Sequence, residues 1–106
     1  MKKYYLAVDI GASSGRHILG CLENGKIVIE EIHRFANRIE KQGNALCWNL
    51  DRLFEEVLYG MAVCRKMGKI PCSIGIDTWA VDYVLLNEQG RPAGKTYAYR
   101  PCSFKR

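Results

Sequence analysis

The sequence lacks any long apolar run. Its 106 residues contain nothing close to the ~20 consecutive apolar residues that a membrane-spanning helix needs. The first residues resemble a secretion signal, but Asp9 interrupts the apolar stretch early and no small-residue cleavage site follows it. We therefore expect a cytoplasmic protein with no membrane partner. The hydrophobic share of 48% is typical of one soluble domain with a modest core.

The sequence also lacks the cysteine patterns of a disulfide scaffold or a zinc site. Its cysteines are odd in number, none is paired as C-x-x-C, and neither His17 nor His33 stands at a metal-ligand spacing from any of them. This pattern indicates reduced, mostly buried thiols, as in cytosolic proteins. The five cysteines are Cys21, Cys47, Cys64, Cys72 and Cys102.

Acidic residues are absent from positions 91–106, which hold five of the 16 lysines and arginines. The other 11 basic residues, in positions 1–90, are balanced by all 11 acidic ones, so this last segment supplies the whole net charge of +5. A neutral body with a basic end is weak evidence for a nucleic-acid surface. Nucleic-acid binding through positions 91–106 therefore ranks last among the functions considered, and no nucleic-acid partner is expected.

What the sequence does contain is a strand that delivers a carboxylate into a turn of small residues. The apolar run Tyr4–Ile10 predicts a buried strand that carries Asp9 near its end, and Gly11-Ala-Ser-Ser-Gly15 and Arg16 follow. Backbone N–H groups in such turns bind anions, arginine adds forked donors for phosphate oxygens, and aspartate ligates hydrated magnesium. The spacing excludes a P-loop and a dinucleotide-binding fingerprint. A plain β-hairpin turn explains the same residues and, on this segment alone, is slightly favoured.

Two further strands and a loop are expected before the chain changes its periodicity. Branched and other apolar residues favour strands on both sides of an Asn-Gly pair that is typical of a tight hairpin turn. The three strands of this expected meander are Tyr4–Ile10, Arg16–Leu22 and Lys26–His33. Positions 35–47 predict a polar loop, with a short extended piece at 45–48.

A helix follows, because apolar residues recur at helical spacing. Asn49 is the expected N-cap, Gly68 ends the helix, and Gly60 costs about 1 kcal/mol relative to alanine inside it. The expected apolar stripe consists of Leu50, Leu53, Phe54, Val57, Leu58, Met61 and Ala62.

After the helix, Cys72–Asp77 predicts a return strand, and the apolar stretch Val81–Leu86 predicts an additional β pair. The return strand would lie parallel to the first, beside it. The fold class that follows is α/β, with the β-β-β-α-β order of a ribonuclease-H-like half domain.

A second group of polar residues stands where the return strand ends. Asp77 and Thr78 are followed by Trp79 and, three positions later, Asp82. Polar groups beside an aromatic face suit a sugar, because hydroxyls need hydrogen bonds and ring carbons need apolar contact. A core tryptophan with turn-capping carboxylates explains the same pattern and, from these residues alone, is favoured.

Four segments together resemble a known family. They are Asp9-Ile-Gly-Ala-Ser-Ser-Gly-Arg16, Glu31-Ile-His-Arg-Phe35, Trp48-Asn-Leu-Asp51 and Gly75-Ile-Asp-Thr-Trp-Ala-Val-Asp82. In this combination they resemble the rhamnulokinase branch of the FGGY carbohydrate kinases, within the actin/hexokinase-like ATPase superfamily. The Asp-Thr-Trp-x-Val-Asp string is the discriminating part, and the resemblance covers residues 4 to about 100.

The resemblance implies an ATP- and Mg²⁺-dependent transfer of phosphate to the 1-hydroxyl of L-rhamnulose. Asp9 would stand near the magnesium ion, and Trp79, Ala80 and Asp82 would contribute to the sugar site. Ala80 stands where the family often has glycine, and its methyl group bears on the fit of the sugar. The phosphates of ATP would meet a loop made of Ala12, Ser13, Ser14, Gly15 and Arg16.

Two departures from the family limit this expectation. Family members have several hundred residues in two lobes, and the aspartate that acts as general base lies in a region corresponding to positions beyond 106. We therefore expect residues 1–100 to be a truncated N-terminal kinase domain, inactive alone, with no catalytic residue of its own. Positions 101–106 depart from the family pattern and are expected to be a non-native tail. The alternatives are a fragment of another FGGY sugar kinase and a non-enzymatic sugar- or nucleotide-binding module.

Overall fold

The computed structural model of the protein describes residues 2–99, so the expected non-native tail at 101–106 lies outside the described residues. In the described residues five strands precede one helix, and a sixth strand follows it. The elements are β1 (Tyr4–Ile10), β2 (Ser14–Glu23), β3 (Lys26–Ala36), β4 (Glu40–Gln42), β5 (Ala45–Cys47), α1 (Leu50–Lys66) and β6 (Pro71–Thr78).

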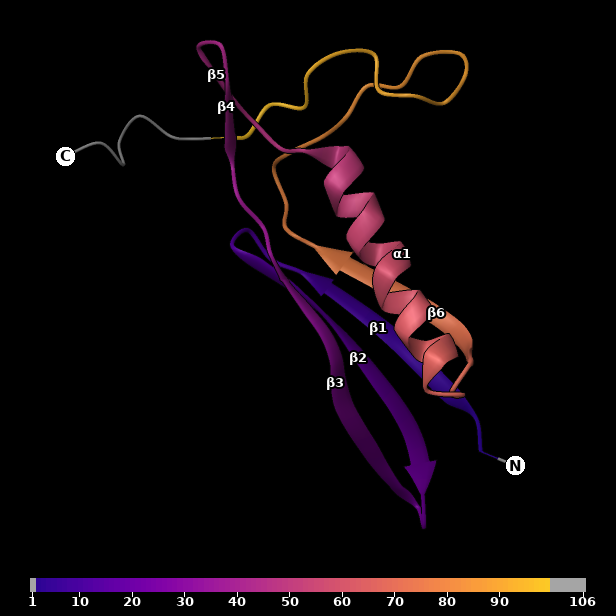
Figure 1. Ribbon diagram of the computed structural model, residues 1–106. Helices are drawn as coiled ribbons and strands as arrows, with labels where there is room; N and C mark the ends of the chain where they lie inside the picture. The colour runs from indigo at the N-terminus through magenta and orange to yellow at the C-terminus, as the bar shows by residue number, and fades with distance from the viewer. Residues whose placement is uncertain (1, 100–106) are drawn as a thin grey trace, which may run out of the picture.

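The main sheet has four strands in the order β3-β2-β1-β6. β1 pairs antiparallel with β2 and parallel with β6, so the chain returns through α1 to the side of the first strand (Figure 1). This arrangement confirms the predicted α/β class and the β-β-β-α-β order.

The turn between β2 and β3 has the geometry that its sequence predicts. Asn24 and Gly25 both adopt positive φ, at 52° and 78°, and Glu23 pairs directly with Lys26. Two consecutive positive φ values define the type I′ turn, whose twist matches that of the strands. The Asn-Gly pair therefore sets the register of the hairpin.

Both ends of α1 close with capping hydrogen bonds. The side chain of Asn49 accepts from the backbone N–H of Arg52 at 3.0 Å. At the other end Gly68 has φ 71°, its N–H donates to the Arg65 carbonyl, and the Lys69 N–H donates to the Cys64 carbonyl. These two bonds form a Schellman motif, which satisfies carbonyls that the helix leaves free. The predicted boundaries of the helix are confirmed.

The core lies between α1 and one face of the sheet. Alternate residues of β1 point to this face, and α1 packs over β2 and β3 rather than over β6. The buried core cluster consists of Leu6, Val8, Ile10, Leu19, Phe35 and Cys64. Of the four described cysteines only Cys72 is exposed.

Three expectations about the elements were wrong in part. Positions 35–47 are not a loop, because β3 continues to Ala36 and β4 and β5 form a hairpin; the extended piece expected at 45–48 is β5. The stretch Val81–Leu86 forms no strand within the described residues, and its one β interaction is an isolated bridge between Leu86 and Pro92. Apolar composition alone does not produce a strand where no neighbouring strand offers hydrogen bonds.

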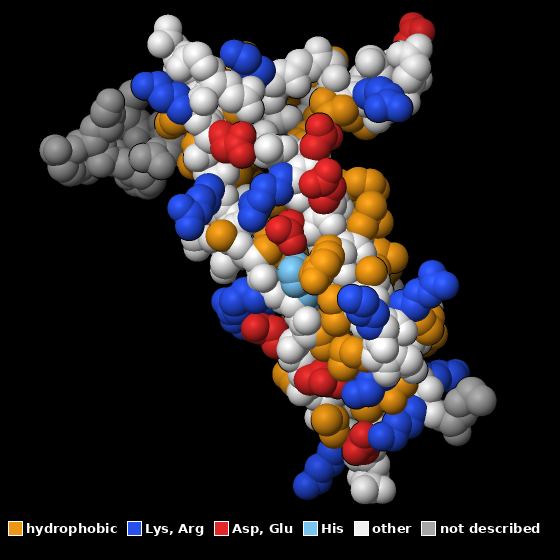
Figure 2. All heavy atoms as spheres, in the orientation of Figure 1, with side chains coloured by type: hydrophobic (Ala, Val, Ile, Leu, Met, Phe, Trp, Pro, Cys, Tyr) orange, Lys and Arg blue, Asp and Glu red, His pale blue; other side chains and the backbone are white. Residues whose placement is uncertain are grey.

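The apolar stripe of α1 is the third expectation that needs correction. Only part of it packs on the sheet, because Phe54 is 64% exposed, Leu58 46% and Met61 41%. Ile74 and Ile76 of β6 are also exposed, since the helix does not cover that strand. Figure 2 shows the resulting run of apolar side chains along the helix. Within residues 2–99 no helix is both long and apolar enough to cross a membrane.

Candidate functional site

Two loops leave the sheet side by side at the same edge. In the parallel pairing of β1 with β6, Asp9 stands opposite Asp77 and Ile10 opposite Thr78. The chain therefore leaves both strands at their carboxyl ends, at adjacent positions. Crevices at the carboxyl ends of parallel strands are where open α/β sheets bind ligands.

The first loop is a tight turn that a buried asparagine holds in place. The Gly11 N–H donates to the Ser14 carbonyl at 2.8 Å. Asn37, only 4% exposed, donates its side-chain N–H to the Gly11 carbonyl at 2.8 Å and its backbone N–H to the Ser13 carbonyl at 3.0 Å. Sequence reasoning missed Asn37, whose only signal was its place in a polar segment. Its contacts fix the carbonyl groups of the turn and leave Ala12 and Ser13 exposed.

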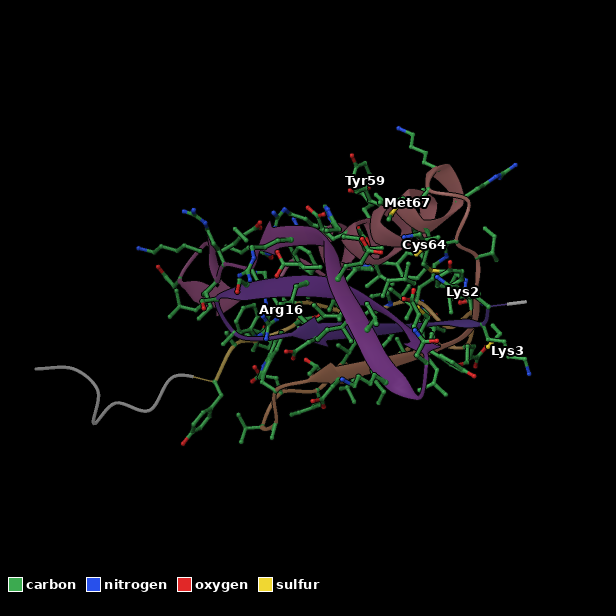
Figure 3. The ribbon with its side chains drawn as sticks, turned by 90° about the horizontal axis from the view of Figure 1, so that it is seen from below. Lys2, Lys3, Arg16, Tyr59, Cys64 and Met67 are labelled. Atoms are coloured by element: carbon green, nitrogen blue, oxygen red, sulfur yellow. The ribbon has the colours of Figure 1, made fainter. Side chains whose placement is uncertain are left out.

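Gly15 and Arg16 were both expected to contact phosphate, but Gly15 is buried and only Arg16 is exposed. Gly15 is buried in β2, where an added Cβ atom would lie 2.2 Å from Cζ of Phe35, so packing alone requires glycine there. Arg16 is exposed, with its Nε 3.7 Å from Oδ2 of Asp9 and its Nη1 3.9 Å from Oε1 of Glu31. Its guanidinium therefore lies beside two carboxylates, at the end of the sheet away from Lys2 and Lys3 (Figure 3).

Glu31 itself is held by another arginine. Arg34 donates from Nε at 3.0 Å and from Nη2 at 2.8 Å, and this forked contact lowers the pKa of Glu31 and raises that of Arg34. Because Glu31 is already paired with Arg34, its contact with Arg16 is weak, at 3.9 Å between Oε1 of Glu31 and Nη1 of Arg16. The Arg16 guanidinium thus keeps free donors for a further anion.

The second loop is organised around the carboxylate of Asp82. Its Oδ2 accepts the indole N–H groups of Trp79, at 2.6 Å, and of Trp48, at 2.7 Å, while Oδ1 accepts the backbone N–H of Tyr99 at 2.9 Å. The two indole rings lie 4.4 Å apart between centroids and are tilted by 47°. Burial acts to raise the pKa of Asp82, but the three hydrogen bonds together outweigh it and leave that pKa below its ordinary value.

Trp48 was not expected at this site from its residue type or spacing. It is 5% exposed and precedes α1, and its backbone N–H donates to the Thr96 carbonyl at 2.8 Å. A buried indole N–H needs an acceptor, so the carboxylate of Asp82 in the second loop was the one signal that could have pointed to Trp48. Trp79 is only partly buried and packs against the core cluster.

A cavity of about 230 Å³ opens between the two tryptophans, the start of α1 and the end of β6. Its walls include Ile10, Leu53 and Thr78 together with Trp48, Trp79 and Asp82. A second, larger hollow of about 390 Å³ shares Asp82 and Tyr83 with the first and is also lined by Lys95 and Tyr99. Ala80, which was expected against the sugar, is exposed and lines neither cavity.

The structure thus brings the expected residues into two groups. Asp9 and Arg16 form one, and Trp79 and Asp82 form the other, with Trp48 and Asn37 as additions that the sequence did not reveal. Among residues 2–99 no three His, Cys, Asp or Glu side chains gather as a metal site.

Comparison with known proteins finds close relatives in sequence. The chain is 49% identical over 100 residues to a rhamnulokinase of Oceanobacillus iheyensis, covering 94% of this chain and 21% of that protein. It is 53% identical over 98 residues to a rhamnulokinase of Halalkalibacterium halodurans, covering 92% and 21%, and 46% identical over 96 residues to that of Bacillus subtilis, covering 91% and 20%. The chain spans about a fifth of the length of these curated relatives. No model of a protein family matches it.

Solved structures of sugar kinases share the fold. A gluconate kinase from Lactobacillus acidophilus superposes with a TM-score of 0.72 at 14% identity, over 92% of this chain and 20% of that one. A xylulose kinase from the same organism gives 0.68 at 14% identity, over 90% and 19%. A PPX-GPPA enzyme from Aquifex aeolicus gives 0.53 at 14% identity, over 74% and 27%. The chain therefore shares its fold with part of these sugar kinases, and its sequence is homologous to the N-terminal portion of rhamnulokinases.

Proposed function

We propose that this chain supplies the phosphate loop and one wall of the sugar site of an ATP-dependent kinase that phosphorylates the 1-hydroxyl of L-rhamnulose. The observation that supports this most is the adjacent exit of the two loops from β1 and β6, with Asp9 opposite Asp77. The residues that we assign to phosphate and to the sugar therefore leave the sheet at one edge. The identity of about half to curated rhamnulokinases supports the choice of sugar.

The phosphates of ATP would lie on the first loop. Ala12 and Ser13 are exposed residues whose backbone N–H groups would meet the phosphates, and the free donors of Arg16 suit phosphate oxygens. A magnesium ion fits here as well, because it needs only one or two carboxylates beside the phosphates, and Asp9 offers a half-exposed one. When bound, the ion would neutralise phosphate charge, and Asp9 would orient its water shell.

The sugar would lie against the second loop. The partly buried face of Trp79 offers apolar contact to ring carbons, and Thr78 offers a hydroxyl group in the wall of the same cavity. Ala80, next to Trp79 but outside the cavity walls, and the remaining lone pair of Asp82 stay in the proposal as minor contacts to the sugar. In this proposal residues 1–100 are the kinase segment of a cytoplasmic enzyme, and positions 101–106 are a non-native tail.

The isolated chain would be inactive in this proposal. Phosphoryl transfer depends on positioning both substrates and on a base for the hydroxyl proton, and no residue among 2–99 is assigned that role. The purified chain, incubated with Mg-ATP and L-rhamnulose, is expected to give no turnover above a control with Asp9→Ala. Turnover by the isolated chain would contradict this part of the proposal.

A chimera tests whether the two loops of this chain support the proposed reaction. Residues 4–99 of this chain replace the homologous segment of the Bacillus subtilis rhamnulokinase, and phosphorylation of L-rhamnulose is measured by coupled ADP release. The chimera is expected to be active and its Asp9→Ala variant inactive. A folded but inactive chimera would show that the loops of this chain do not support the reaction. L-xylulose and glycerol serve as competing substrates, which separate a rhamnulokinase from another sugar kinase of the same fold.

A non-enzymatic sugar- or nucleotide-binding module is the second candidate, because both loops leave adjacent strands of one sheet. Calorimetric titration of the isolated chain with L-rhamnulose and with Mg-ATP distinguishes it. Binding of sugar by the chain alone, with no turnover in the chimera, would favour the module.

A further inference from the structure

Asp82 has nearly all of its hydrogen-bonding capacity used within the protein. A carboxylate offers about four lone-pair positions. Three are taken, by the indole N–H groups of Trp48 and Trp79 and by the backbone N–H of Tyr99. A residue whose main task was to bind a sugar hydroxyl would not be saturated in this way.

The three donors come from segments that are far apart in the sequence. Trp79 follows β6, Trp48 joins β5 to α1, and Tyr99 lies at the end of the described chain. The last of these segments is tied to β5 by backbone hydrogen bonds from Ala98 to Leu46 and from Trp48 to Thr96. Asp82 therefore joins the loop after β6 to two segments that are already bonded to each other, the one around Trp48 before α1 and the one that ends at Tyr99.

The position of Trp79 depends on this junction. Its ring lies 4.4 Å from that of Trp48, and one oxygen atom, Oδ2 of Asp82, accepts both indole N–H groups. Trp48 is buried and Trp79 partly exposed to the cavity of about 230 Å³, so the inner ring supports the outer one. Shared acceptance by one oxygen fixes the angle between the rings as well as their distance.

We propose that Asp82 is a positioning residue that holds Trp48 and Trp79 together as a rigid aromatic wall for the sugar. It acts through the indoles and is not itself a main sugar ligand. This inference rests on the proposed function for the identity of the ligand. The geometry of the tryptophan pair exists without ligand, so the two ideas are tested separately.

The first test measures the ligand-free chain. Trp48 and Trp79 are the two tryptophans of the sequence, so near-ultraviolet circular dichroism and tryptophan emission report on this pair. Asp82→Asn keeps the shape of the side chain but turns one of its acceptor atoms into a donor, which then faces an N–H group. We expect loss of most of the tryptophan bands in the near-ultraviolet spectrum, to which the six tyrosines also contribute, while the far-ultraviolet spectrum is unchanged. An unchanged near-ultraviolet spectrum in the variant would overturn the proposal.

A matched control separates positioning from general damage. Asp77→Asn makes the same chemical change at an exposed carboxylate of β6 for which the structure records no indole contact, and its near-ultraviolet spectrum should equal that of the wild type. If Asp82→Asn fails to fold, the wild-type chain still decides the matter by nuclear magnetic resonance. Both indole N–H resonances should be protected from solvent exchange, and two freely exchanging resonances would contradict the proposal.

The second test measures sugar binding in the active chimera. Asp82→Asn should raise KM for L-rhamnulose about tenfold, because two indoles must then be ordered by the sugar, and should leave KM for Mg-ATP unchanged. An equal loss for both substrates would show that Asp82 serves only the fold. If the chimera has no activity at all, the proposed function fails, while the spectroscopic result on the free chain still decides the role of Asp82.

Discussion

The imidazole ring of His17 occupies the space beside Gly60 where any other residue would place its Cβ atom. His17 is fully buried, its Nε2 lies 3.1 Å from the carbonyl oxygen of Val57, and a Cβ atom on Gly60 would stand 2.1 Å from the ring. The glycine that disfavours the helix on local grounds is therefore what lets α1 approach β2.

We expect Gly60→Ala to destabilise the chain, although alanine is the better helix former. Because the added Cβ atom would lie 2.1 Å from a fully buried ring, the clash should cost about 3 kcal/mol, at the upper end of overpacking effects, and so exceed the ~1 kcal/mol gained in helix propensity. Urea denaturation followed by circular dichroism measures the change. Gly75→Ala is the control, because an added Cβ atom there meets nothing within 4 Å. Greater stability of Gly60→Ala would show that the helix does not rest on His17.

Stability should fall as the solution becomes acidic below the ordinary pKa of histidine. Burial lowers the pKa of His17, His33 adds to this effect, and the Val57 carbonyl and Glu56 oppose it. Since Nε2 is bonded to Val57, the proton would add at Nδ1, a buried atom with no hydrogen-bond partner. The unfolded chain then binds the proton more readily than the folded one, so stability is complete above the unfolded pKa of about 6.5 and declines below it.

The measurement is the free energy of unfolding between pH 7.5 and pH 5, values chosen to bracket the ordinary pKa of about 6.5. His17→Leu should flatten the curve in this interval, even where the variant is less stable overall. His33 faces His17 from β3, and its Nε2 lies 2.7 Å from Oε1 of Glu56. The variant His33→Gln serves as the control, and it should keep the slope that His17→Leu removes. A wild-type curve with no slope below pH 6.5 would contradict this account.

Gly15→Ala should separate packing from phosphate binding in the first loop. The added methyl group meets the ring of Phe35, so the variant should lose about 1–3 kcal/mol of stability. Phe35→Leu in the same chain should restore part of it by opening space. If the double variant also recovers Mg-ATP binding in the chimera, Gly15 matters for packing alone. Failure of Phe35→Leu to restore any stability would contradict the proposed clash.

Substitutions on α1 should reveal which part of its apolar stripe is packed. Phe54→Ala should change stability by less than about 0.5 kcal/mol, because that ring is 64% exposed. Val57→Ala should cost about 1–2 kcal/mol, because Val57 packs against the core cluster. Thermal unfolding of the two variants compares them, and equal losses would contradict the packing described here.

Local chemistry made much of the fold predictable. The Asn24-Gly25 turn, the Asn49 cap and the Gly68 end of the helix each depend on neighbours within a few residues, so the sequence specifies them directly. The β4–β5 hairpin was missed because each of its strands has only three residues, too few to show a periodic pattern. The exposure of Phe54 was missed because periodicity indicates an apolar face but does not show what covers it.

The candidate site was predictable in its residue types and only partly in its roles. Asp9 and Arg16 lie on either side of one tight turn, and they are close because they pair in the register of the β1–β2 hairpin. The contact between Trp48 and Asp82 joins segments 34 residues apart, and no local pattern indicates it. Asn37 likewise acts through a contact 26 residues distant. Assignment of the site residues to phosphate and sugar stays a prediction.

The parallel pairing of β1 with β6 also sets the order in which the site forms. We expect the β1–β2–β3 meander and the turn after β1 to form early, because their contacts are local, whereas β6 must close a loop of more than sixty positions to reach β1. During synthesis the turn after β1 would therefore form before the loop after β6 has left the ribosome. We expect the contact between Trp48 and Trp79 to form last, because Asp82, which joins them, is itself held by Tyr99, so the loop after β6 would become ordered after the turn that follows β1.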